Sequence, residues 1–314
     1  MKKIITDYDG VVVESELAKG FGWYLGYSYL NNDSEIKLDL LKELEFNPDK
    51  AKPRLDEIAA SRRNDLLVAR SCSGGTTFDF AKKIWQKFCV KEEREPNEEE
   101  LRFINEQLIP VRHKIKEQIV NLYSLPIDSN LRFFKALCEE MQYAENNTLT
   151  EYHPLGIVTL SPTKILKRQF ESTINGKTVW GAFPEFPKLF GNYSANGFQY
   201  IECGGDLGPN YDGISKDEIK VQSYRLICKK LNISPEETIS FEDTSKGIEA
   251  AKKIGVLCCG IKDEISLQDL SQADIVVHGS LENIISLAPL IAKSEPKKAI
   301  EIIGNYLTDT GAKK

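Results

Sequence analysis

Residues 238–255, TISFEDTSKGIEAAKKIG, contain a short apolar run, two adjacent carboxylates and an amphipathic segment in direct succession. Residues 238–241 are typical of a buried parallel strand. Residues 245–254 space their apolar side chains as an α-helix does, and Gly255 is a typical helix end. The stretch therefore predicts a strand followed by a helix, with Glu242 and Asp243 at the point where the strand ends.

Similar short apolar runs recur elsewhere in the chain, and amphipathic segments separate the later ones. One such segment opens at Ser215 with a capping box that ends at Glu218. Strands that alternate with helices at these lengths predict right-handed βαβ units, and so an α/β fold with a doubly wound, Rossmann-like parallel sheet. The further runs are residues 3–6, 156–160, 200–203, 256–259 and 274–277.

A long and almost wholly helical segment separates the first predicted strand from the second. Its amphipathic stripes include one at Leu131, Phe134, Leu137 and Met141, and Pro110 and Pro126 are expected to break the helices. We predict an insertion rather than a tandem domain: a catalytic core at 1–16 plus 150–292, a helical cap domain at 17–149, and a C-terminal extension at 293–314. The aromatic insertion at 178–200 is either a flap packed on the sheet edge or a segment that closes over a substrate or another subunit.

Composition excludes several classes of protein. Lys and Arg number 41 against 47 Asp and Glu, so the net charge of −6 argues against nucleic acid as a partner. No apolar run approaches the roughly 18 residues that span a bilayer, which argues against a membrane partner. Seven scattered cysteines indicate buried thiols in a reducing compartment. We therefore predict a cytoplasmic protein, and the sequence leaves its oligomeric state open.

Paired carboxylates also end the first predicted strand, in the sequence Asp7-Tyr8-Asp9-Gly10. In a parallel sheet Asp7 and Asp9 would share an edge with Glu242 and Asp243, where α/β folds bind ligands. Four carboxylates would repel one another unless a hard cation neutralised them, and this predicts Mg²⁺. A calcium loop is disfavoured because three valines follow Gly10. Alternatively, Asp243 only caps the helix that follows it.

Residues 7–15 (DYDGVVVES) resemble the first motif of the haloacid dehalogenase superfamily, and residues 241–255 resemble its fourth, in particular that of the β-phosphoglucomutase-like branch. The resemblance implies that Asp7 is a nucleophile that forms an aspartyl-phosphate. Asp9 would be the general acid and base, and its backbone carbonyl would help to hold Mg²⁺. Asp243 would bind the ion directly, and Glu242 through water. The metal ligands are thus Asp7, Asp9, Glu242 and Asp243.

The family's second motif is a hydroxyl residue at the end of a core strand, which Thr159 matches. The family often has Asn next, and Leu160 departs from that pattern, with Ser161 as a second candidate donor. The third motif is a lysine that pairs with the nucleophile. The frequent Lys-Pro form is missing here, and Lys216 and Lys220 fit equally well.

The resemblance implies a phosphoric monoester hydrolase (a phosphotransferase). The expected reaction is Mg²⁺-dependent hydrolysis of a small phosphate ester through an aspartyl-phosphate. A β-phosphoglucomutase-like phosphomutase would use the same Asp7 and Asp9 and is the first alternative. The second is a non-catalytic binding protein that has retained the fold. The sequence does not identify the substrate, because this fold serves many substrates.

Overall fold

The structure is a computed structural model of the chain. The greater part of the aromatic insertion lies outside the residues that it describes. In the described residues, no helix combines the length and the apolar character needed to cross a bilayer. The described residues are 3–31, 38–71, 77–90, 94–144, 155–171, 173–174, 177–178, 180, 193–194, 197–198, 200–207, 214–262 and 268–311.

The chain divides into two compact units. The core unit comprises Met1–Val13, Pro126–Glu171 and Thr178–Lys314, and the helical unit comprises Glu14–Leu125 and Ser172–Lys177. The second unit therefore interrupts the first, as expected of an insertion.

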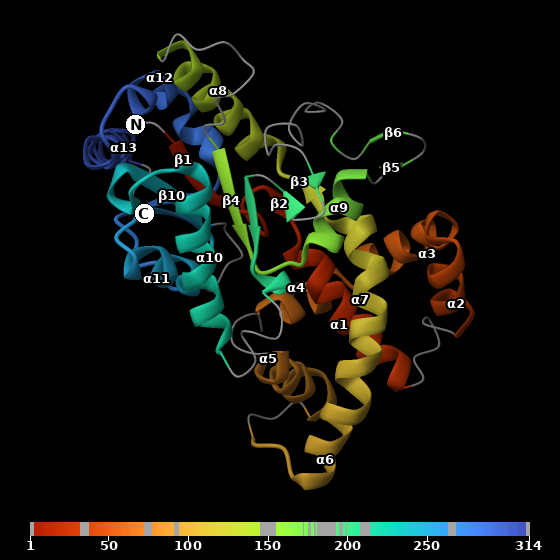
Figure 1. Ribbon diagram of the computed structural model, residues 1–314. Coiled ribbons are helices and arrows are strands. Elements are labelled where there is room, and N and C mark those ends of the chain that lie inside the picture. The colour runs from red at the N-terminus through yellow and green to blue at the C-terminus, as the bar shows by residue number, and fades with distance from the viewer. Residues whose placement is uncertain are drawn as a thin grey trace. The chain divides into compact units, whose positions relative to one another are not determined.

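A six-stranded parallel sheet forms the centre of the core unit (Figure 1), and its strand order is β12-β11-β10-β1-β4-β9. The predicted α/β class with a doubly wound parallel sheet is confirmed, and each of the six predicted strands is present. Strands β1 and β10 are neighbours, with Thr6 opposite Phe241. The strands are β1 (Lys3–Asp7), β4 (Leu155–Thr159), β9 (Ile201–Cys203), β10 (Thr238–Glu242), β11 (Leu257–Lys262) and β12 (Ile275–His278).

Helices cover both faces of this sheet. On one face Ile5 and Val158 pack against apolar residues of α10 and α11. On the other face Ile4 and Ile157 pack against α8, α12 and α13, because successive strand residues point to opposite sides. The helices of the unit are α8 (Asp128–Ala144), α9 (Thr163–Glu171), α10 (Lys216–Leu231), α11 (Ser245–Lys253), α12 (Ala288–Ala292) and α13 (Pro296–Asp309), with 3₁₀ turns η4 (Gly204–Asp206), η6 (Pro235–Glu237) and η7 (Leu281–Leu287).

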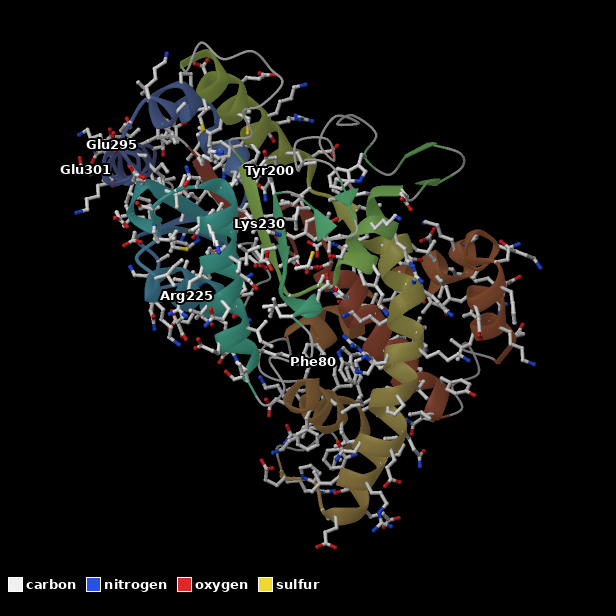
Figure 2. All side chains as sticks on the ribbon, in the orientation of Figure 1. Phe80, Tyr200, Arg225, Lys230, Glu295 and Glu301 are labelled. Carbon is white, nitrogen blue, oxygen red and sulfur yellow. The ribbon has the colours of Figure 1, made fainter. Side chains whose placement is uncertain are left out.

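Helix α10 begins at the predicted cap, where the Ser215 hydroxyl accepts a hydrogen bond from the Glu218 backbone N–H at 3.2 Å. At its other end Lys230 pairs with Glu202 of β9 at 2.8 Å. Figure 2 labels Lys230 and Tyr200 beside this edge of the sheet. The helix is thus fixed to the sheet through its apolar face and through an ion pair.

Helix α8 belongs to the core unit, whereas the sequence analysis placed it in the cap. Phe133 and Phe134 pack edge-on against Phe241 of β10, with ring centroids 5.6 and 5.4 Å away. The 293–314 extension likewise joins this core, because Ala299, Ile303 and Leu307 of α13 are buried in the same cluster. An amphipathic pattern shows that a helix buries one face, but it does not identify the partner.

The helical unit packs around aromatic side chains. Trp23 stacks on Phe80 with ring centroids 5.2 Å apart, and the Arg112 guanidinium lies 4.7 Å from the Trp23 ring. Pro110 does not break the helix as predicted, since a π-helical turn precedes it and helix α7 continues beyond it. The elements are α1 (Glu16–Leu30), α2 (Leu38–Phe46), α3 (Pro48–Ser61), α4 (Arg63–Ser71), α5 (Thr77–Ile84), the π-helical η1 (Trp85–Val90), α6 (Glu98–Phe103), the π-helical η2 (Ile104–Leu108) and α7 (Ile109–Tyr123).

Short strands occupy other described segments. They are β2 (Val13–Glu14), β3 (Leu125–Pro126), β5 (Thr173–Ile174), β6 (Lys177–Thr178), β7 (Tyr193–Ser194) and β8 (Gly197–Phe198).

The buried side chain of Asn130 joins α8 to two other segments of the core unit. Its amide donates to the Val11 carbonyl, and its carbonyl accepts from the Leu281 backbone N–H, both at 2.9 Å. We expect Asn130→Ala to lower the free energy of unfolding by at least about 2 kcal/mol, because two buried backbone groups lose their partners. Urea unfolding measures this change. The exposed Asn283, which donates to the His278 carbonyl, is the matched control, and a loss of equal size in Asn283→Ala would contradict the argument.

Candidate active site

The carboxyl end of β1 turns sharply after Asp7. The backbone N–H groups of Val12 and Val13 both donate to the Tyr8 carbonyl, at 2.9 and 3.0 Å. Gly10 has a φ of +85°, and a Cβ at this position would lie 1.9 Å from an Asp243 carboxylate oxygen. The turn therefore requires glycine for its backbone conformation and for the close approach of Asp243.

Strand β10 ends in Glu242 and Asp243, and α11 follows at once. The Thr244 side chain accepts from the Gly247 backbone N–H at 3.1 Å, so Thr244 is the N-cap of α11. The alternative function of Asp243 as the helix cap is thus excluded. The absence of a side chain at Gly247 makes room for Glu242, since a Cβ there would lie 1.8 Å from one Glu242 carboxylate oxygen.

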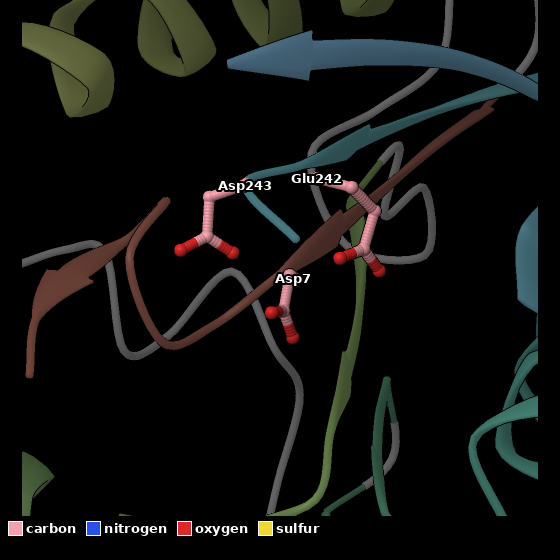
Figure 3. Close-up of side chains that lie close together, drawn as sticks. All are labelled: Asp7, Glu242 and Asp243. Carbon is pink, nitrogen blue, oxygen red and sulfur yellow. The ribbon is translucent and has the colours of Figure 1, made fainter. Parts of the chain in front are cut away.

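Three carboxylates meet at this edge of the sheet (Figure 3). One oxygen each from Asp7, Glu242 and Asp243 lies within 4.8 Å of the other two. Glu242 is wholly buried and Asp7 nearly so. Strands β1 and β10 are parallel neighbours, so their ends bring these side chains together.

Lys220 of α10 compensates part of this charge. Its buried Nζ lies 2.7 Å from Asp7 Oδ1 and 3.3 Å from Glu242 Oε1. Burial alone lowers the pKa of Lys220, but the carboxylates of Asp7 and Glu242 outweigh burial and raise it, so the lysine stays charged. Lys216, the other candidate, is an exposed residue at the first position of α10.

Lys220 compensates the negative charge of the carboxylates only in part. Burial and then the neighbouring Asp7 raise the pKa of Glu242 to about 8. Burial raises the pKa of Asp7 as well, and Asp9 adds to that rise while Lys220 opposes it. Within the described residues, the buried Oε2 of Glu242 has no hydrogen-bond partner. Clustered carboxylate oxygens with an unsatisfied buried atom are suitable ligands for a hard divalent cation.

Tyr224 lies one helical turn after Lys220 and also contacts this cluster. Its hydroxyl donates to Glu242 Oε1 at 2.5 Å. Burial, followed by the charge of Glu242, raises the pKa of Tyr224, so the phenol remains a donor. Tyr224 was not among the candidate site residues that the sequence indicated. Its spacing of four residues from a candidate lysine was the available signal for this role.

Asp9 makes a separate set of contacts. Its Oδ2 accepts from the Thr159 hydroxyl at 3.3 Å and from the Ser161 hydroxyl at 3.0 Å. The Asp9 side chain is not one of the three clustered carboxylates, which leaves its backbone carbonyl as the metal ligand that the resemblance implies. The structure thus brings together the residues of the first, second and fourth motifs with Lys220, and leaves Lys216 outside.

Comparisons with known proteins support this assignment of the fold. No family model matches the chain. A solved hydrolase of the haloacid dehalogenase family from Deinococcus radiodurans R1, with bound phosphate and sodium, superposes with a TM-score of 0.51 at 16% identity, covering 93% of this chain and 96% of that one. The chain therefore shares the fold of that hydrolase.

Other similar proteins have lower TM-scores or match less of the chain. A family IA hydrolase from Entamoeba histolytica has a TM-score of 0.48 at 15% identity, covering 94% and 100% of the two chains. A β-phosphoglucomutase from Clostridium difficile has a TM-score of 0.41 at 16% identity, covering 90% and 93%. Validoxylamine A 7'-phosphate phosphatase from Streptomyces hygroscopicus subsp. limoneus is 33% identical over 71 residues. That match covers 23% of this chain and about a third of that protein's length.

The contact between Gly247 and Glu242 can be tested by substitution. We expect Gly247→Ala to destabilise the protein by about 1–3 kcal/mol, because the new methyl group has to displace a buried carboxylate. Gly304, inside α13, is the matched control, since a Cβ there would meet its nearest atom at an ordinary 3.7 Å. Gly304→Ala should stabilise the protein by about 0.5–1 kcal/mol through helix propensity alone. Chemical unfolding compares the two variants, and equal effects in the same direction would refute the steric explanation.

Proposed function

We propose that the chain is a Mg²⁺-dependent phosphatase that hydrolyses a small phosphate ester through an aspartyl-phosphate on Asp7. The observation that carries the proposal is the buried contact of Asp7 with Lys220 beside Glu242 and Asp243. A carboxylate held by an ammonium at the ligand-binding edge of a parallel sheet is suited to nucleophilic attack on phosphorus. The name of the partial relative, a validoxylamine A 7'-phosphate phosphatase, also supports hydrolysis of a phosphate ester.

In this proposal Asp7 attacks phosphorus, and the bond to the leaving oxygen breaks as Asp9 gives that oxygen a proton. Asp9 then takes a proton from water as the water attacks the aspartyl-phosphate. Lys220 keeps Asp7 ionised and oriented and offers its ammonium to the transferred group. Asp7, Glu242, Asp243 and the Asp9 backbone carbonyl would hold Mg²⁺, which when bound offsets the negative charge of carboxylates and phosphoryl oxygens.

The phosphomutase alternative uses the same two aspartates. It differs in that the phosphoryl group on Asp7 returns to a sugar instead of reaching water. A requirement for a bisphosphate activator, measured as product formed against its concentration, would favour the mutase.

The assignment of the lysine gives the sharpest test of the proposed site. We expect Lys220→Met to lower kcat/KM for an aryl phosphate by about 100–1,000-fold, because a charge beside the transferred group is lost. Lys216→Met, one turn away and exposed, should change it by less than about threefold. Circular dichroism checks that both variants are folded. Equal effects of the two substitutions would contradict the assignment of Lys220.

The chemistry itself is tested with Asp7→Asn. Aryl phosphate hydrolysis should require Mg²⁺ and should fall below detection in this variant, because an amide is not a nucleophile of comparable strength. Activity that persists in Asp7→Asn, or in the wild type after metal removal with a chelator, would contradict the mechanism. If the wild type neither turns over nor binds beryllofluoride as an aspartyl-phosphate mimic, a binding role becomes the better explanation.

A further inference from the structure

Two hydroxyl groups contact the same oxygen of Asp9. Ser161 Oγ donates to Asp9 Oδ2 at 3.0 Å and Thr159 Oγ1 donates to it at 3.3 Å. The Ser161 backbone N–H in turn donates to Thr159 Oγ1 at 3.0 Å. Ser161 therefore makes the shorter contact to the acid and also orients the second hydroxyl.

The segment that carries Ser161 is fixed by its neighbours in the core unit. A Cβ at Gly205 would lie 2.7 Å from the Leu160 carbonyl, so the chain of η4 packs closely against it. The backbone N–H of Thr163 donates to the Asp206 carboxylate at 2.8 Å and ties the start of α9 to the same turn. A hydroxyl on a restrained segment can hold its partner in one orientation with little loss of entropy.

Leu160 lies between the two hydroxyl residues and is 40% exposed. Strand β4 ends at Thr159, and Leu160 and Ser161 form the bend that follows it, where the Ser161 backbone N–H donates to Thr159 Oγ1. This arrangement explains how Thr159 and Ser161 reach one oxygen of Asp9 while an apolar side chain separates them in sequence.

We propose that Ser161 is a positioning residue, which holds Asp9 Oδ2 so that Oδ1 is the oxygen that exchanges the proton. The inference rests on the proposed function of Asp9 as the general acid and base. An oxygen that accepts two hydroxyl hydrogen bonds is a poor site for a proton, so the proton of the neutral acid resides on Oδ1.

The proton on Asp9 Oδ1 leaves in the first half of the reaction and returns in the second. The Asp7 carboxylate forms a bond to phosphorus, the bond from phosphorus to the leaving oxygen breaks with its electron pair, and that oxygen takes the proton of Asp9 Oδ1. In the second half, water gives a proton back to Oδ1 and its oxygen to phosphorus, which releases phosphate and restores Asp7.

Leaving-group dependence tests the proposal, because protonation matters most for a poor leaving group. The substrates are phenyl phosphate and 4-nitrophenyl phosphate, which have similar shapes and differ in how readily the oxygen leaves. The parameter is kcat/KM, which reports the steps up to phosphorylation of Asp7. We expect Ser161→Ala to lower it about 10–100-fold for phenyl phosphate and less than about threefold for 4-nitrophenyl phosphate.

Three variants make the test specific. Asp9→Asn should change the ratio of the two substrates in the same direction and by more, and Ser161→Thr should restore the wild-type ratio. Ser223→Ala is the matched control, because the buried Ser223 hydroxyl donates to the Ile219 carbonyl within α10. Its loss should leave the ratio unchanged whatever its effect on stability.

The outcomes separate the two proposals. An active wild type whose substrate ratio is unchanged in Ser161→Ala, or changed equally by Ser223→Ala, overturns the role of Ser161 alone. A wild type that hydrolyses neither substrate with Mg²⁺ overturns the proposed function and this inference with it.

Discussion

Repulsion between buried carboxylates is the constraint on which the site depends. Asp7 and Glu242 are almost or fully removed from water, and Asp243 lies beside them. Removing an unpaired carboxylate from water costs far more than a typical folding contact contributes. The Lys220 ammonium and the Tyr224 hydroxyl meet part of that cost through contacts of 2.7 and 2.5 Å. Burial and then the charge of Asp7 still raise the pKa of Glu242, so these two contacts compensate the cluster only in part.

The parallel sheet is what brings these groups to one place. Thr6 of β1 lies opposite Phe241 of β10, so the next residue on each strand, Asp7 and Glu242, ends its strand at the same level. Gly10 and Gly247 then allow the carboxylates to approach the backbone, since a side chain at Gly10 would overlap Asp243 and one at Gly247 would overlap Glu242. The glycines in the two motifs are therefore as necessary to the geometry as the carboxylates are.

The parts of the structure that follow from local pattern could be predicted from the sequence. The six strands of the central sheet and the shared edge of Asp7 with Glu242 rest on short apolar runs and on the rules of parallel sheets, and the N-cap of α10 rests on Ser215. The choice between Lys216 and Lys220 could not be made, because both lie on one helical face. Burial distinguishes the two lysines in the structure. Lys216, nearer the start of the helix, is exposed, and Lys220, one turn later, is buried and contacts Asp7.

The other differences between the sequence-based predictions and the structure arise from tertiary contacts. The stripe of α8 is the same whether it packs on a helix or on a sheet, and tertiary contacts such as that with Phe241 assign it to the core unit. Ser161 was a candidate donor to a phosphoryl oxygen, and its contact with Asp9, which is 152 residues away in the sequence, could not be read from the local pattern.

The buried face of helix α10 connects packing to chemistry. Val221, Ile227 and Leu231 lie in the apolar cluster beneath the sheet, and the same helix presents Lys220 and Tyr224 to Glu242. Any shift of the helix that improved the apolar packing at the cost of those polar contacts would leave buried charges unpaired. Because an unpaired buried charge costs more than the loss of a few methylene contacts, the polar pair fixes the position of the helix along the sheet. The apolar face then holds the lysine at the depth where it meets Asp7.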